Sequence, residues 1–317
     1  MECPLLELRT ASVIINDSIS SPILLENGTP QGSVISPILF LVMINDFPEL
    51  SKHTSTALFA DDSTIWRSGK NMAHIITHLQ EDLALIEKWC LRWGFTLNHS
   101  KTTAIVFTKK KKLTNPVLFV NNTIIKVEQK CYFLGVYFDK QLTWNSHIQY
   151  ICERAESRLN LMRCISGQSW EANKKILLMI YRSLIRSLMD YACMAFNFAS
   201  QSTLKIPDSI QYKALLIATG GMKGTSLAAL LAECGEKKLE YRRKELIYKY
   251  LIKIDNLHSN PAKSILEDRI YPTLETKFKS KYQEMLEEAY DICQTKKEVS
   301  DDLDILLETT SNLAINT

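Results

Sequence analysis

The spacing of apolar residues changes near residue 140 of this 317-residue chain. Before that point, short apolar runs typical of strands alternate with two apolar segments of helical length. The first covers residues 36–45. The second is amphipathic, with apolar residues at helical spacing from Ile75 to Cys90 and with Gly94 as its predicted end. This pattern predicts a mixed α+β domain over residues 1–140.

Residues beyond about 146 follow a helical period instead. Helices are predicted over four segments, which are 146–165, 171–198, 203–219 and much of 225–255. The fold class is therefore α+β, with a mixed domain followed by an all-helical region and a boundary near 140–146. We expect this helical region to span residues 141–255, and residues 256–317 to form a helical, acidic C-terminal tail.

Turn-forming residues separate the predicted strands. Asn16-Asp17-Ser18 lies between two apolar runs and predicts a hairpin, and Asn121-Asn122 predicts a second hairpin with a tight turn. The sequence FADD, from Phe59 to Asp62, lies between two further apolar runs. Ala60 is small enough for a tight bend, so two strands are predicted to meet there.

The net charge of +3 hides an uneven distribution. Residues 284–308 carry nine acidic and two basic side chains, a net of −7, so the rest of the chain carries +10. A basic body is compatible with a polyanionic partner, and equally with an ordinary surface of mixed sign. Residues 237–253 contribute several lysines and arginines to one predicted helical face, with three tyrosines among them.

Cysteine usage and hydropathy indicate the compartment. None of the eight cysteines forms a CxxC pair, so we expect reduced thiols that pack as small hydrophobic side chains. The longest apolar stretch, Ile38 to Ile44, is too short to cross a membrane. We therefore expect an intracellular protein, cytoplasmic or nuclear and not secreted, without a membrane partner.

The histidines give only a weak metal-binding signal. His74 and His78 are four residues apart on the predicted amphipathic helix and could face the same way. The sequence offers them no third ligand, so we expect no metal there.

Asp61 and Asp62 are the sharpest candidate for chemistry. Adjacent side chains on a plain strand point to opposite faces, so these carboxylates share one site only if the chain turns there. A hairpin tip with exposed carboxylates suits Mg²⁺, with Mn²⁺ as an alternative ion, because hard cations take oxygen ligands. From the FADD residues alone, a plain polar turn is the more frequent explanation.

A second candidate is the segment GTPQGSVISPILF. Gly28, Pro30 and Gly32 make a loop that can approach a nucleotide or base pair closely, directly before a helix. We place Ser36 as the N-cap of that helix and Pro37 at its first helical position. Ordinary helix entry would explain these residues equally well.

Taken in order, these motifs resemble the reverse transcriptases of non-LTR retrotransposons of the jockey-like or I-like kind. The matching segments are TPQGSVISPILF, FADD, Asn98 to Thr102 and FLGVYFD from Phe133 to Asp139, and the likeness extends to about residue 255. The resemblance implies that residues 1–140 are part of a polymerase palm, an antiparallel sheet with helices. It implies a helical thumb or connector for residues 141–255.

The activity that this resemblance implies is RNA-directed DNA synthesis by two-metal nucleotidyl transfer, with Mg²⁺ as cofactor. An RNA template, a DNA primer and deoxynucleoside triphosphates are the expected partners. The implied roles are metal ligation and catalysis for Asp61 and Asp62, charge stabilisation or proton donation at the leaving phosphates for Lys101, nucleotide and template contacts for Pro30, Gln31, Gly32 and Ser33, and the primer grip for the strand at Leu134 and Gly135.

One feature of the family is not matched. The family has a further metal-binding aspartate upstream of the PQG loop, whereas Asp17, the only aspartate before the loop, sits in a predicted turn. We therefore expect a missing N-terminal part of the same element, an inactive chain when it is alone, and uncovered apolar surface. A non-catalytic nucleic-acid-binding relic and a helical protein-interaction module are the alternatives.

Overall fold

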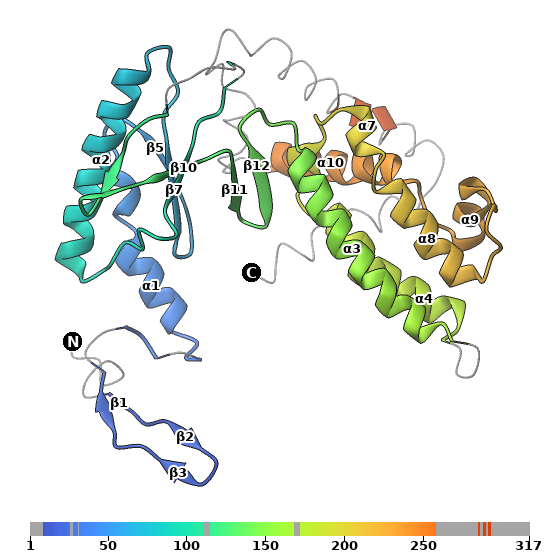
Figure 1. The fold of residues 1–317 in the computed structure, drawn as a ribbon, viewed down its shortest axis with the longest axis horizontal. Coiled ribbons are helices and arrows are strands. Elements are labelled where there is room, and N and C mark those ends of the chain that lie inside the picture. The colour runs from blue at the N-terminus through green and yellow to red at the C-terminus, as the bar shows by residue number, and fades with distance from the viewer. Residues whose placement is uncertain are drawn as a thin grey trace. The chain divides into compact units, whose positions relative to one another are not determined.

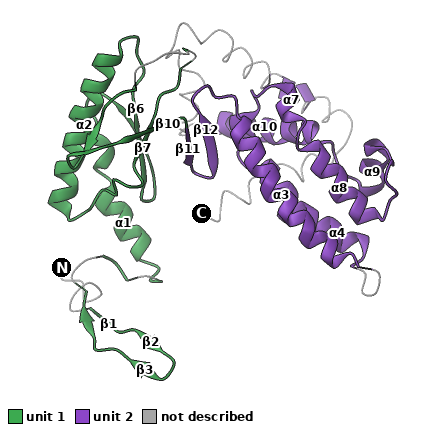
Figure 2. Ribbon diagram, viewed as in Figure 1, with its two compact units in different colours: residues 1–129 green, residues 130–317 purple. Residues whose placement is uncertain are grey.

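The computed structural model describes residues 9–25, 28–30, 32–108, 110, 115–167 and 172–257, with a few more between 285 and 292. The chain divides into two compact units, residues 1–129 and residues 130–317 (Figure 2). The predicted α+β class is confirmed, because short strand pairs dominate the first unit and helices dominate the second (Figure 1). The division falls about ten residues before the predicted boundary, because a hairpin at 130–139 packs with the helices.

The first unit begins with the predicted hairpin around Asn16. Its strands are β1 (Thr10–Ala11) paired with β4 (Ile23–Leu24), and β2 (Ile14–Ile15) paired with β3 (Ser18–Ile19), all antiparallel. Asn16 has a φ of 52°, a left-handed conformation that asparagine tolerates better than most residues. The apolar side chains of this hairpin are exposed, which agrees with the expected uncovered apolar surface.

Helix α1 (Ser36–Ile44) and the short 3-10 helix η1 (Phe47–Leu50) follow. The prediction that Ser36 caps α1 was wrong, because the N-cap is Ile35 and Ser36 is already helical. The hydroxyl of Ser36 instead donates a hydrogen bond to the carbonyl oxygen of Pro30 at 2.6 Å. This bond ties the loop before the helix to its first turn.

Helix α2 (Met72–Trp93) is the main support of the first unit, and its predicted end at Gly94 is confirmed by a left-handed φ of 72°. The predicted hairpin that ends in FADD is also confirmed: β5 (Ser55–Phe59) pairs antiparallel with β6 (Asp62–Trp66). Two small cores on α2 hold η1 and these strands in place. Their buried residues are Phe47, Leu83, Ile86, Trp89, Cys90, Leu118, Val120 and Ile125.

Two more strand pairs complete the first unit. β8 (Phe119–Val120) and β9 (Thr123–Ile124) form the predicted hairpin around Asn121-Asn122. β7 (Thr103–Ile105) pairs with β10 (Lys126–Glu128) in parallel, not in the antiparallel sheet that the resemblance implied. The chain between them has room to cross over and return in the same direction, because it contains the β8–β9 hairpin.

The second unit starts with the hairpin of β11 (Lys130–Phe133) and β12 (Val136–Asp139), which packs on α3 (Asn145–Ile165). Trp144 is buried at the start of α3 and contacts Phe138, so it is part of the core of this unit. The remaining helical elements are α4 (Lys174–Ile180), the π-helix η2 (Tyr181–Arg186), α5 (Ser187–Asp190), α6 (Cys193–Phe196), α7 (Gln201–Leu204), α8 (Asp208–Thr219), α9 (Leu227–Cys234) and α10 (Leu239–Asn256).

Three predicted helices are therefore interrupted. The segment 171–198 changes to π-helix at Tyr181 and breaks at Ala192, whose φ is 53°. The segment 203–219 restarts after Pro207, and 225–255 breaks at Gly235, whose φ is 61°. The predicted tail helix lies almost wholly outside the described residues.

The six cysteines within the described residues are all free thiols, as expected. Burial raises the pKa of Cys152 and of Cys193 to about 11, so these two remain protonated and behave as hydrophobic side chains. Among the described helices, none combines the length and the apolar character that a membrane crossing requires.

Candidate active site

The tip of the β5–β6 hairpin carries the two candidate carboxylates. Phe59 and Asp62 are direct cross-strand partners, so Ala60 and Asp61 alone make the turn. Ala60 has a φ of 51°, the backbone strain that a two-residue turn requires of a residue with a side chain. The turn brings Asp61 and Asp62 to the outside of the unit, and both are exposed.

The two faces of this hairpin have different surroundings. Leu58 and Ile65 point toward α2 and pack on its core. Asp62 lies on the opposite face together with its partner Phe59 and with Trp66, whose side chains are largely exposed. The carboxylate of Asp62 therefore lies on an exposed face of the hairpin, together with the exposed rings of Phe59 and Trp66.

Asp61 and Asp62 have no protein partner within the part of the chain that the structure describes. Neither carboxylate accepts a hydrogen bond or forms an ion pair there, and no third histidine, cysteine or carboxylate completes a ligand group with them. Two unpaired oxygen donors fit a hard divalent ion that takes its other ligands from water and from phosphates. The donor set therefore suits Mg²⁺ and leaves its coordination incomplete.

The base of the hairpin is fixed by Asp82, a residue that the sequence analysis missed. Its buried carboxylate on α2 accepts hydrogen bonds from the backbone N–H groups of Lys52, His53 and Thr54 at 2.9 to 3.2 Å. It also accepts one from the hydroxyl of Thr54 at 2.7 Å. The signal was available, because Asp82 is a charged residue in the middle of the apolar stripe of α2.

These bonds keep Asp82 ionised. Burial alone would raise the pKa of this carboxyl group, but the Thr54 hydroxyl and the three backbone N–H groups together hold the pKa below its ordinary value. The segment that leads into β5 is thereby attached to α2 by a charged acceptor. The tip residues at 61 and 62 consequently project from a rigid base.

The loop that was predicted to contact nucleotide and template is only partly described. Pro30, Gly32 and Ser33 lie in the described part, and Gln31 lies outside it. Gly32 has a φ of 89°, which only glycine adopts easily, and its position is open enough for close approach. The Ser36 bond to Pro30 connects this loop to α1.

Lys101 lies in a turn that its own motif builds. The side-chain oxygen of Asn98 accepts hydrogen bonds from the N–H groups of Ser100 and Lys101, at 3.1 and 3.2 Å. The carbonyl oxygen of Asn98 accepts one from the Thr102 hydroxyl at 2.9 Å. The Asn-x-x-Lys-Thr sequence is therefore a turn in front of β7, and Lys101 is exposed on it.

The expected primer-grip residues differ from the prediction in their local structure. Leu134 and Gly135 form the two-residue turn between β11 and β12, with φ values of 45° and 80°, and are not part of a strand. The Tyr191 hydroxyl donates to the carbonyl oxygen of Leu134 at 2.7 Å. Both residues belong to the second unit, whereas the other candidate site residues belong to the first.

The basic face expected on α10 is largely neutralised by acidic neighbours. Arg242 donates a hydrogen bond to the carboxylate of Asp190 at 3.2 Å, and Lys237 and Lys249 both form ion pairs with Glu245 at 3.0 Å. Arg243 is buried. This surface is therefore a network of ion pairs, not a free cationic stripe for phosphates.

Comparison with known proteins agrees with the resemblance. Residues 2–138 match the family described as reverse transcriptase (RNA-dependent DNA polymerase). A probable RNA-directed DNA polymerase from transposon X-element of Drosophila melanogaster is 26% identical over 219 residues, covering 68% of this chain and 24% of that protein. The RNA-directed DNA polymerase from mobile element jockey of the same species is 24% identical over 262 residues, covering 80% and 28%. No solved structure matches significantly.

The first part of the chain is thus similar to reverse transcriptases, and its hairpin of two carboxylates agrees with that likeness. Residues 2–138 match this enzyme family, and the relatives are named as RNA-directed DNA polymerases of transposons and of the mobile element jockey. The chain spans about a quarter of the length of the first of these relatives.

Proposed function

We propose that this chain is the metal-holding part of a retrotransposon RNA-directed DNA polymerase. The observation that supports this most strongly is the pair of exposed, unpartnered carboxylates, Asp61 and Asp62, at the tip of a braced hairpin in a reverse transcriptase segment. The substrates would be an RNA template, a DNA primer and deoxynucleoside triphosphates, as the names of the relatives suggest.

In the proposed reaction, the primer 3′-hydroxyl attacks the α-phosphate of a deoxynucleoside triphosphate and pyrophosphate leaves. Mg²⁺ bound at Asp61 and Asp62 would stabilise the negative charge on the attacking and leaving oxygens. Lys101 stands on an exposed turn, from which its ammonium group could neutralise or protonate the leaving pyrophosphate.

The other candidate residues would position the substrates. The loop of Pro30, Gln31, Gly32 and Ser33 would lie along the nascent base pair, where the left-handed Gly32 leaves room for close approach. The turn of Leu134 and Gly135 would contact the primer end. Mn²⁺ would serve in place of Mg²⁺, because both ions accept carboxylate and phosphate oxygens.

The proposal includes a low activity for the 317-residue chain alone. Two-metal catalysis needs ions held at a fixed separation, and the described residues bring only two carboxylates to the tip. We expect a segment outside these 317 residues to supply a further carboxylate. Purified chain with Mg²⁺ should therefore leave a primer unextended, and extension should appear when the upstream segment of the same element is fused to it.

The metal site can be tested separately from activity. Fe²⁺ binds in place of Mg²⁺ and, with ascorbate and peroxide, cleaves the backbone beside its ligands. We expect cleavage close to Asp61, suppressed by excess Mg²⁺ and lost in Asp61→Asn and Asp62→Asn. Asp17→Asn is the matched control, because Asp17 also lies in an exposed two-residue hairpin turn.

Three results would count against the proposal. Backbone cleavage that is unchanged in both Asp61→Asn and Asp62→Asn would refute the metal site. Primer extension by the unfused chain, abolished in Asp61→Asn, would support the chemistry but refute the expected inactivity. Salt-sensitive primer–template binding by a fused protein that never extends would favour the non-catalytic nucleic-acid-binding alternative.

A further inference from the structure

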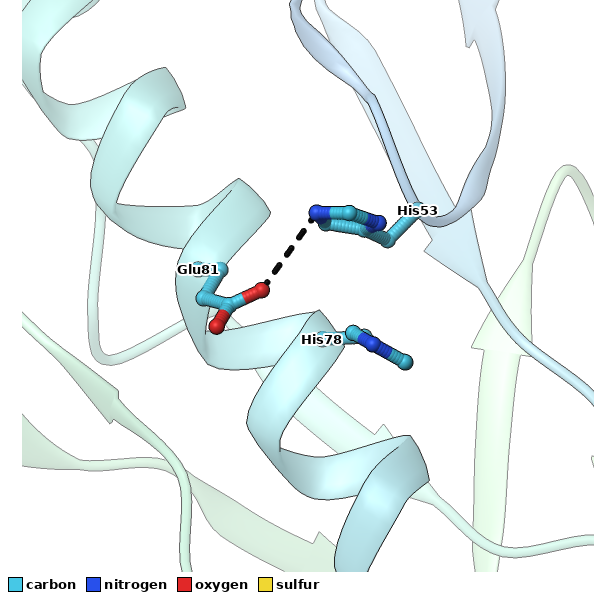
Figure 3. A group of neighbouring side chains, drawn as sticks. All are labelled: His53, His78 and Glu81. Carbon is cyan, nitrogen blue, oxygen red and sulfur yellow. Dashed lines mark ion pairs between the residues drawn. The ribbon is translucent and has the colours of Figure 1, made fainter.

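Away from the carboxylate tip, three side chains of metal-ligand type meet at the base of the β5–β6 hairpin (Figure 3). His78 and Glu81 come from adjacent turns of α2, and His53 comes from the segment that enters β5. One ligand atom of each lies within 4.8 Å of the other two. These neighbours of His78 were not predicted from its sequence surroundings, because His53 is distant along the chain.

The two imidazole rings lie against each other and beside the carboxylate. The imidazoles of His53 and His78 are stacked, with centroids 4.7 Å apart and planes inclined by 24°. Nε2 of His53 lies 3.4 Å from a carboxylate oxygen of Glu81. The ring nitrogen Nδ1 of His78 is buried and has no hydrogen-bond partner, which leaves an uncompensated polar atom beside this group.

The backbone around the three residues is already fixed. The carboxylate of Asp82, the residue after Glu81, accepts hydrogen bonds from the backbone N–H groups of His53 and Thr54 at 3.0 and 2.9 Å. The guanidinium of Arg67 donates to the carbonyl oxygen of His53. Only side-chain rotation is then needed to bring the ligand atoms to the spacing of about 3.3 Å that tetrahedral coordination with bonds near 2.05 Å requires.

We propose that His53, His78 and Glu81 form a Zn²⁺ site that fastens the base of the hairpin to α2. Two imidazoles and one carboxylate are a ligand set that suits Zn²⁺, with water in the fourth position, whereas Mg²⁺ prefers oxygen donors alone. The side chains of His53 and Glu81 are 42% and 53% exposed, so the ion can enter from solvent. The bound ion would stiffen the strands that carry Asp61 and Asp62.

This site is distinct from the proposed catalytic one. Phe59, at the far end of β5, is six positions after His53, which corresponds to about 20 Å of extended chain. Its existence therefore does not depend on polymerase activity, and the two proposals can fail independently.

The test is a zinc titration of the full-length chain after removal of metal with a chelator. We expect one Zn²⁺ per chain, unaffected by millimolar Mg²⁺, and an affinity reduced at least about tenfold in His53→Gln, His78→Gln and Glu81→Gln. His99→Gln is the matched control, because His99 is an exposed histidine of the same unit outside the group. Asp61→Asn should also bind normally.

Two further measurements keep the proposal falsifiable. Zn²⁺ should raise the thermal midpoint of the wild type but not of His53→Gln, an exposed position where folding is not at risk. The Co²⁺-substituted protein should show visible bands without the ultraviolet charge-transfer band of thiolate ligands. Absence of zinc binding, an affinity equal to that of the wild type in all three variants, or a thiolate band that assigns the ion to cysteines would each overturn the site.

Discussion

The hydroxyl of Thr54 donates a 2.7 Å hydrogen bond to the carboxylate of Asp82, and this contact fixes the start of β5 against α2. It is the shortest of four bonds that one buried carboxylate accepts from three consecutive residues. A buried anion with this many donors is a strong local anchor, because losing it leaves several backbone N–H groups without acceptors.

Asp82→Asn should therefore destabilise the first unit. The amide keeps the shape but replaces one acceptor oxygen by a donor, so we expect a loss of about 3 kcal/mol in the free energy of unfolding. Denaturant titration followed by tryptophan fluorescence, in metal-free buffer, measures this. Glu81→Gln, the exposed neighbour, should change stability by less than about 0.5 kcal/mol. Equal effects at both positions would refute the anchor role.

In the second unit, the buried carboxylate of Glu236 makes a second anchor. It accepts hydrogen bonds from the guanidinium groups of Arg182 at 2.6 Å and of Arg186 at 2.7 Å, and its side chain is 2% exposed. Glu236→Gln would remove the counter-charge of Arg182 and leave Arg186 paired with Asp190 alone, so we expect a cost of about 3 kcal/mol. Chemical unfolding monitored by far-UV circular dichroism gives the value.

Glu233→Gln is the matched control for Glu236. Glu233 also pairs with a cation, Lys174 at 2.5 Å, but its side chain is 66% exposed. An exposed pair contributes little, so this variant should unfold at nearly the same denaturant concentration as the wild type. If Glu233→Gln proved as costly as Glu236→Gln, burial would not be what distinguishes the two pairs.

The lowered pKa of Glu245 predicts that the stability of the second unit depends on pH. Burial tends to raise its pKa, but hydrogen bonds and charge from Lys249 and Lys237 lower it to about 2. Because the folded pKa lies below the unfolded one, the contribution of Glu245 to stability is fully present above the ordinary glutamate pKa and is lost as pH falls toward 2.

The thermal midpoint of the wild type should consequently fall between pH 5 and pH 3, and Glu245→Gln should show a shallower fall over the same range. Calorimetric scans at several pH values measure both slopes. Parallel curves for the two proteins would mean that Glu245 titrates alike in the folded and unfolded states.

Local sequence signals predicted the elements whose cause is local. The turns at Asn16 and Asn121 and the end of α2 at Gly94 depend on residues that tolerate positive φ, and all three were found. The FADD turn was predicted from its apolar flanks and its small Ala60. The two-carboxylate tip was therefore accessible from sequence, although its catalytic role stays a prediction.

The misplaced elements depend on distant contacts or on an unmarked backbone change. The break at Ala192 has a positive φ at a residue that gives no such signal, so 171–198 was predicted as one helix. The hydroxyl of Ser36 can cap a helix, but it donates its hydrogen bond to the Pro30 carbonyl oxygen instead. Asp82 stands out in the apolar stripe of α2, but its contact with the distant His53 exists only when the chain is folded.

Gly135 provides the last prediction, because two separate constraints meet at this turn residue. Its φ is 80°, and a Cβ placed there would lie 2.9 Å from Cε1 of Tyr191, the ring whose hydroxyl bonds to Leu134. Gly135→Ala should therefore cost more than backbone strain alone, about 2 to 3 kcal/mol in total. Gly235→Ala is the control, since its φ is 61° but its Cβ position is empty, and it should cost about 1 kcal/mol.

The steric part of the free-energy cost of Gly135→Ala can be isolated with a second substitution, Tyr191→Ala. In that background the ring is gone, so the cost of Gly135→Ala should fall to the value measured at Gly235. Urea unfolding of the four proteins of this double-mutant cycle gives the coupling energy. A coupling near zero would show that the Tyr191 ring moves aside freely, and that the β11–β12 turn is held by its backbone conformation alone.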